Sequence, residues 1–156
     1  MIRSAFLLVC SVALAVQAAT EQKTVDGVLY HLIQAPASEV KILWTDDDGV
    51  ALRTFPAASR YLKAKGVQAE ALMNGGIFEP GGVPSGLLIQ DGRELRPVNR
   101  NAGKGNFYLE PNGIFLVGSA GAAVIRSDEY PLTGVTVQQA VQSGPLLLRK
   151  GQTHPA

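Results

Sequence analysis

Cysteine and histidine are almost absent from this chain of 156 residues, which contains one cysteine and two histidines. The cysteine, Cys10, lies in an N-terminal stretch that we expect to be removed, so the mature chain cannot form an internal disulfide and must be stabilised by an apolar core. Two histidines are too few for a histidine-rich zinc site. We predict no metal and no cofactor.

Charge is also sparse. Charged residues make up 17% of the chain, with 14 Lys+Arg against 13 Asp+Glu, and the two signs balance once Arg3 is set aside. No basic run or stripe interrupts this balance, so we expect no nucleic-acid partner.

Residues 1–18 are typical of a secretory signal peptide. Arg3 supplies the positive start, residues 5–16 form a short apolar run, and Ala18 offers a small side chain for cleavage before Ala19. The run is shorter than the roughly 20 apolar residues that span a bilayer, so no stable membrane span is expected after cleavage. We predict a periplasmic or secreted protein with one domain over residues 19–156.

The 17 glycines and 9 prolines indicate many turns and short strands. The pattern predicts an α+β fold, with an antiparallel or mixed β-rich sheet built from hairpins and one main helix around residues 55–65. Thr54 is the expected N-cap of that helix, and Gly66 its stop. Hairpins are expected between residues 28–33 and 40–44, 86–89 and 94–96, and 106–109 and 114–117, with further strands at 70–73 and 122–125.

The glycine-rich stretch at residues 73–86 lies between two apolar runs. One interpretation is a binding loop, in which Asn74 and Glu79 point into a pocket while Gly75 and Gly76 bring backbone N–H groups close to a substrate. The other is a long turn without a further role.

A second polar loop runs over residues 99–106 and carries Arg100, Lys104 and Asn106. Its cations and free backbone N–H groups are suited to holding an anion such as phosphate. The same composition is also typical of a flexible surface loop. No Gly-x-Ser-x-Gly elbow, Walker loop or dinucleotide motif is present, so the remaining amides, glycines, carboxylates and cations favour sugars and phosphate esters as ligands.

Four segments in this order resemble the phosphodiester glycosidase domain family: residues 73–81, 84–92, 105–113 and 142–147. The resemblance covers most of residues 27–156. It implies hydrolysis of the bond between a sugar anomeric carbon and a phosphodiester, in cell-envelope or extracellular glycans. A phosphate leaving group needs no separate acid, which leaves phosphate binding, oxocarbenium stabilisation and a base for water.

The resemblance matches Asn74, Gly75 and Gly76 to one family signature, and Gln142, Ser143 and Gly144 to another. From these matches we expect Asn74 and Gln142 to hydrogen-bond the substrate. Residue type and loop position alone suggest Glu79 as the base, and Arg100 or Lys104 as phosphate contacts.

Family members continue beyond the signature at Gln142 into further segments, whereas this chain stops at Ala156. We therefore expect a domain that is incomplete at its C-terminal end. Two alternatives to the enzyme stay open, a non-catalytic envelope module that binds a glycan or a protein partner, and an inactive fragment.

Overall fold

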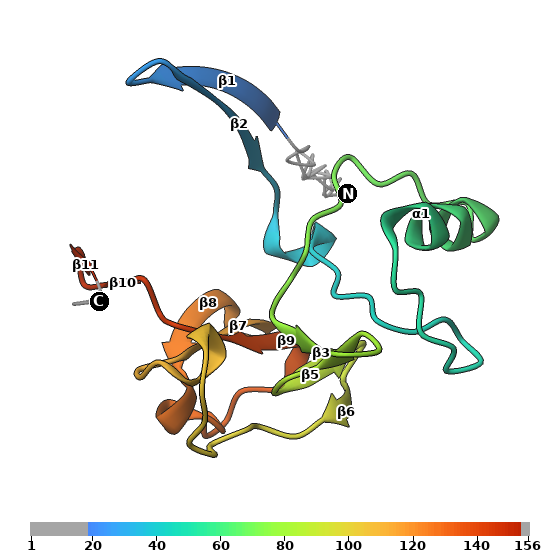
Figure 1. The fold of residues 1–156 in the computed structure, drawn as a ribbon. Helices are drawn as coiled ribbons and strands as arrows, with labels where there is room; N and C mark the ends of the chain where they lie inside the picture. The colour runs from blue at the N-terminus through green and yellow to red at the C-terminus, as the bar shows by residue number, and fades with distance from the viewer. Residues whose placement is uncertain (1–18, 154–156) are drawn as a thin grey trace, which may run out of the picture. The chain divides into compact units, whose positions relative to one another are not determined.

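The structure is a computed structural model that describes residues 19–153, so the predicted signal peptide lies outside the described residues. The chain divides into two units, residues 1–36 and 37–156. The α-helix is α1 (Phe55–Ala64), and the short 3-10 helices are η1 (Ala37–Glu39), η2 (Asn106–Tyr108) and η3 (Ser127–Glu129). The strands, shown in Figure 1, are β1 (Ala19–Val25), β2 (Val28–Gln34), β3 (Phe78–Glu79), β4 (Val83–Pro84), β5 (Leu88–Gln90), β6 (Arg93–Arg96), β7 (Gly113–Gly118), β8 (Gly121–Arg126), β9 (Val137–Ser143), β10 (Leu148–Arg149) and β11 (Gln152–Thr153).

The first unit contains one antiparallel hairpin, β1 with β2. Asp26 and Gly27 join the strands with φ of 50° and 77°, the positive values that a two-residue hairpin turn requires. The predicted pairing of residues 28–33 with 40–44 is therefore wrong. The partner strand β1 was not predicted because its sequence is mostly polar and lacks an apolar alternation.

Residues 40–44 form no strand, and two of their backbone N–H groups donate to glutamine side chains instead of to a strand ladder. The Ile42 N–H donates to Gln139 Oε1 at 3.0 Å, and the Trp44 N–H donates to Gln90 Oε1 at 2.9 Å. Both glutamines belong to strands of the main sheet. The apolar pattern of this segment thus indicates that it packs beside the sheet, although it is not one of the strands.

The predicted helix is confirmed as α1. Thr54 is extended and its hydroxyl accepts a hydrogen bond from the Ala57 N–H at 3.3 Å, while Pro56 stands in the first turn. Lys65 caps the C-terminus, and Gly66 follows with φ of 72°, a value that ends a helix at little cost. Local chemistry at both ends therefore sets the boundaries.

The second unit is built on a five-stranded antiparallel sheet with the order β6-β5-β9-β7-β8 (Figure 1). Strand β9 lies in its centre and joins the hairpins β5–β6 and β7–β8. The buried core comes from these inner strands and the residue before β5, namely Leu87, Ile89, Ile114, Leu116 and Ala140. The C-terminal end of β9 thereby places Gln142 and Ser143 beside the core.

The predicted hairpin around Asp91 and Gly92 is confirmed by β5 and β6, with φ of 50° and 77° at the turn. The predicted strand at residues 122–125 is confirmed within β8. Its partner is β7, so the hairpin predicted between residues 106–109 and 114–117 is wrong. Residues 106–108 instead form η2, because Phe107 turns inward and is buried.

The predicted strand at residues 70–73 is also wrong. No described strand pairs with it, and Met73 is 83% exposed. An apolar run this short acquires strand structure only from a neighbour. The coarse fold is nevertheless as predicted, since the chain is β-rich, its sheets are antiparallel, and α1 is the one α-helix among residues 19–153. In that same range no helix is long and apolar enough to cross a membrane.

Candidate functional site

Gln142 in β9 is the point at which three loops meet, and its side chain is only 1% exposed. Its Oε1 accepts hydrogen bonds from the Leu87 N–H at 3.0 Å and the Asn99 N–H at 2.8 Å. Its Nε2 donates to Asn99 O at 2.7 Å and to Asn112 Oδ1 at 3.2 Å. All four hydrogen-bonding positions of the amide are used within the protein. Gln142 thus organises the loops, and the geometry offers no free position for the substrate contact expected from sequence.

Two glycines leave room for the Gln142 amide and for its partner Asn112. A Cβ on Gly86 would lie 2.7 Å from both Gln142 Cδ and Phe107 Cζ, and a Cβ on Gly144 would lie 2.9 Å from Asn112 Cβ. Real Cβ atoms do not approach other atoms so closely, so larger residues are excluded without rearrangement. The predicted site residue Gly144 therefore acts in packing, next to η2 and its first residue, Asn106.

The loop of Asn74, Gly75 and Gly76 lies against β9. A Cβ on Gly76 would be 2.9 Å from Val141 Cγ2, 3.2 Å from Gln142 O and 3.8 Å from Ser143 Cβ. Asn74 is exposed, and its Oδ1 accepts a long hydrogen bond of 3.4 Å from the Gly76 N–H. The structure thus brings the two predicted signatures together, and leaves the Asn74 amide group facing solvent.

Glu79 sits at the end of β3, which pairs with β4 in a short hairpin inside the glycine-rich stretch. The Ser85 hydroxyl donates to Glu79 Oε1 at 2.8 Å, and Ser85 itself is buried. The Ser85 carbonyl accepts a hydrogen bond of 2.7 Å from Asn99 Nδ2. Glu79, an exposed carboxylate, is therefore oriented by a buried serine that the next loop holds in place.

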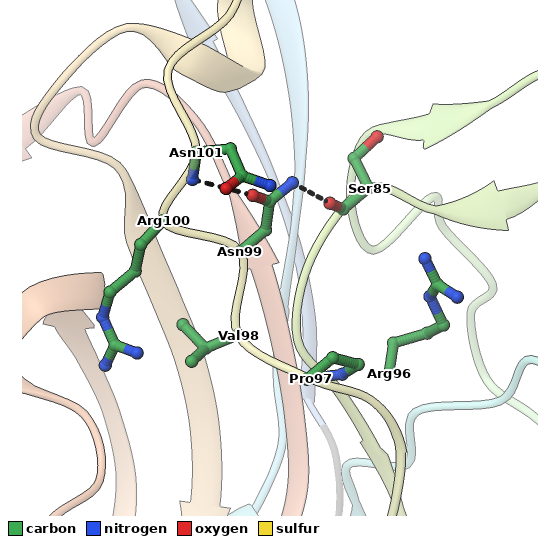
Figure 2. A pocket seen from close by; sticks show the side chains of 7 residues that line it. All are labelled: Ser85, Arg96, Pro97, Val98, Asn99, Arg100 and Asn101. Atoms are coloured by element: carbon green, nitrogen blue, oxygen red, sulfur yellow. Dashed lines mark hydrogen bonds between the residues drawn. The ribbon is translucent and has the colours of Figure 1, made fainter.

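Ser85 also lines a surface pocket of about 340 Å³. Its other lining residues follow one another along the chain from the last residue of β6, as Figure 2 shows: Arg96, Pro97, Val98, Asn99, Arg100 and Asn101. Two guanidinium groups on a pocket wall favour an anionic ligand, because arginine matches phosphate and carboxylate oxygens in charge and shape. In Figure 2 the two side chains extend to opposite sides of the loop.

The two arginines differ in how they are held. Arg100 Nη2 donates to the carbonyls of Tyr130 at 2.5 Å and Ser127 at 3.4 Å, which fixes its position. Arg96 is exposed, and its side chain makes no hydrogen bond or ion pair with the described residues. Burial raises the pKa of the Tyr130 phenol, and the Glu94 carboxylate raises it further, so this phenol is neutral at neutral pH.

Arg100 is the one predicted site residue that lines this pocket, and Lys104 and Asn106 are two of those that do not. Both are exposed and neither lines it. Lys104 makes no hydrogen bond or ion pair within residues 19–153. The described chain also has no group of three or more metal-binding side chains.

Sequence reasoning missed Ser85, Arg96 and Asn99. No Gly-x-Ser-x-Gly elbow surrounds Ser85, Arg96 is the last residue of β6, and Asn99 follows that strand after Pro97 and Val98. A sequence signal did exist, because polar residues directly after a strand gather where loops meet.

The comparisons with known proteins add the following. Residues 67–156 match the family described as "Phosphodiester glycosidase". A curated relative, "Uncharacterized protein YigE" of Escherichia coli (strain K12), is 33% identical over 125 residues, which are 80% of this chain and 48% of the relative. The chain thus spans about half the length of that relative. No solved structure matches the chain.

Proposed function

The chain belongs to the phosphodiester glycosidase family, and we propose that it hydrolyses the bond between a sugar anomeric carbon and a phosphodiester. One observation within the chain carries this proposal. The Ser85 hydroxyl that orients Glu79 belongs to a residue lining the pocket with Arg96 and Arg100. A carboxylate and an anion-binding surface, joined by one residue, are the two elements that this reaction requires.

In the proposed reaction Glu79 is the base. Ser85 occupies Oε1, which leaves Oε2 to take a proton from water. The water oxygen attacks the anomeric carbon, the bond to the phosphate oxygen breaks, and the bonding electrons leave with the phosphate. The products are the free sugar and a phosphate monoester, so atoms and charge balance without a separate acid.

The other predicted residues take different roles in this proposal. Arg100 stabilises the negative charge that grows on the departing phosphate, because its position is already fixed. Asn74 contacts a sugar hydroxyl through its exposed amide. Gln142 acts through the loops that it holds, without touching the substrate.

The test is hydrolysis of an α-N-acetylglucosaminyl phosphodiester by the purified protein. We expect Glu79→Gln to lower kcat at least about a hundredfold, the effect of losing a positioned base, while substrate binding stays within a few fold. Glu70→Gln is the matched control, because Glu70 is an exposed carboxylate four positions before Asn74 and its side chain makes no hydrogen bond or ion pair among the described residues. Full turnover by Glu79→Gln would contradict the assignment of the base.

Binding of the phosphodiester without turnover by the parent protein would instead support a non-catalytic module. We also propose that the mature protein is periplasmic or secreted and acts on cell-envelope or extracellular glycans. Recovery from the medium or periplasm of a chain that starts at Ala19 would support this, as judged by mass spectrometry. Recovery of the uncleaved chain in the cytoplasm alone would contradict it.

A further inference from the structure

Asn99 occupies the junction between the buried amide of Gln142 and the pocket. Its backbone N–H and carbonyl both pair with the Gln142 side chain, at 2.8 and 2.7 Å. Its own side chain makes two further hydrogen bonds, one from each end of the amide, to Ser85 and to Asn101 (Figure 2). Asn99 is half-buried, and every polar atom that it carries is engaged.

The two side-chain bonds lead to different parts of the site. Nδ2 donates to the Ser85 carbonyl at 2.7 Å, and the Ser85 hydroxyl in turn donates to Glu79. Oδ1 accepts from the Asn101 N–H at 3.0 Å, which closes a turn around Arg100. One side chain therefore connects the proposed base with the loop that carries the proposed phosphate contact.

We propose that Asn99 is a positioning residue that sets Glu79 and Arg100 relative to one another. This inference rests on the proposed function. Its two branches are separable, because the donor Nδ2 serves Ser85 and Glu79 whereas the acceptor Oδ1 serves the turn at Arg100. Small misplacements of a catalytic group lower rates strongly, by about a hundredfold for 1 Å.

Three substitutions separate the branches. Asn99→Ser keeps a short acceptor for the turn and loses the reach to Ser85, and Asn99→Asp keeps the acceptor and sets a carboxylate oxygen against the Ser85 carbonyl. Asn99→Ala removes both bonds. We expect kcat to fall about ten- to a hundredfold in all three, while KM for the phosphodiester stays within about threefold for Asn99→Ser and rises about tenfold or more for Asn99→Ala.

This split between kcat and KM is the deciding readout, because general destabilisation lowers the active fraction without changing KM. The melting temperature of each variant is measured alongside. Equal KM values for Asn99→Ser and Asn99→Ala, or a kcat within twofold of the parent for both, would overturn the inference.

A second measurement does not need turnover. In ¹⁵N NMR spectra of the purified protein, Asn99→Ser is expected to shift the amide signals at Ser85 and Gly86 and to leave those at Arg100 and Asn101 nearly unchanged, whereas Asn99→Ala is expected to shift both groups. Absence of turnover by the parent protein overturns the proposed function alone. The same shifts in both variants overturn the positioning role.

Discussion

The side-chain amide of Gln142 pairs with the backbone of Asn99 through two hydrogen bonds, at 2.8 and 2.7 Å, across 43 positions of sequence. The pair links the centre of the sheet to the edge of the pocket. Because the same amide also binds Leu87 and Asn112, its chemistry can be tested by changing a single atom.

The substitution Gln142→Glu replaces the donor Nε2 with an oxygen that faces two acceptors, Asn99 O and Asn112 Oδ1. The introduced carboxyl must be protonated to donate there, so burial raises its pKa in the folded state above its unfolded value. The variant therefore gains stability as the pH falls towards about 5, by about 1.4 kcal/mol per pH unit, and loses it as the pH rises.

Urea unfolding at pH 5 and pH 8 measures this effect. Gln138→Glu is the control, since Gln138 is an exposed glutamine of the same strand and its side chain makes no hydrogen bond among the described residues. A Gln142→Glu variant whose stability does not depend on pH would show that the amide is not held as described.

The substitution Gly86→Ala tests the close packing beneath the same amide. The added methyl would meet Gln142 and the Phe107 ring, at 2.7 Å from Phe107 Cζ. Overpacking of this kind costs about 1–3 kcal/mol of unfolding free energy. Gly75→Ala is a suitable comparison in denaturant unfolding, because its nearest contact would be Val141 Cγ1 at an ordinary 4.0 Å. Equal losses in the two variants would contradict the packing described.

Sequence predicted the parts of the fold whose cause is local. Thr54 and Gly66 mark the ends of α1, and Asp91-Gly92 marks a hairpin, because each signal acts within a few residues. Residues 40–44 were misassigned since their partners are glutamine side chains up to 97 positions away. The strand propensity of a short segment does not depend on such distant partners and so cannot predict them.

The residues of the candidate site likewise fall into those that the sequence indicated and those that only the structure revealed. The structure places the signatures at Asn74 and Gln142 next to each other. A glutamine that anchors buried loops and a glutamine that binds a sugar look the same in a sequence. The burial of Gln142 could therefore be seen only in the structure. Ser85 and Asn99 were missed because their roles depend on bonds between separate loops.

Arg96 offers a test of anion binding at the pocket. It is exposed and unpaired among the described residues, so its loss should leave the melting temperature unchanged. We expect Arg96→Gln to raise KM for an anionic phosphodiester about three- to tenfold, and the difference from the parent to shrink at high salt, since screening weakens exposed charges.

Arg93→Gln is the matched control for this measurement, because Arg93 belongs to the same strand and does not line the pocket. Salt titrations of KM for both variants and the parent distinguish a local contact from general charge. An equal effect of the two substitutions would contradict a role for Arg96 in binding.

Asp47 provides a pH test remote from the pocket. It lies in a turn closed by a hydrogen bond from the Gly49 N–H to the Asp46 carbonyl. Its carboxylate accepts a hydrogen bond from the Tyr61 hydroxyl at 2.6 Å and forms an ion pair with Lys65 at the end of α1. Lys65 first, and Tyr61 second, lower the pKa of Asp47. The contribution to stability is therefore present above the unfolded pKa of about 3.9 and is lost as the pH falls through the lower folded value.

We expect Asp47→Asn to be less stable than the parent at pH 7 and to approach it at about pH 2.5, with a small effect because the pair is exposed. Asp48→Asn is the control, as the Asp48 side chain makes no hydrogen bond or ion pair within the described chain. Chemical unfolding at both pH values decides the matter, and a difference that stays constant with pH would count against the ion pair.

The central position of β9 has a consequence for the growing chain on the ribosome. Hairpins β5–β6 and β7–β8 are complete once residue 126 has been synthesised, yet they share no ladder with each other and meet only through residues 137–143. Until that stretch emerges, one apolar edge of each hairpin is open to pairing with another nascent chain. The sheet closes, and the loops of the pocket gain their common anchor at Gln142, in the same late step of translation.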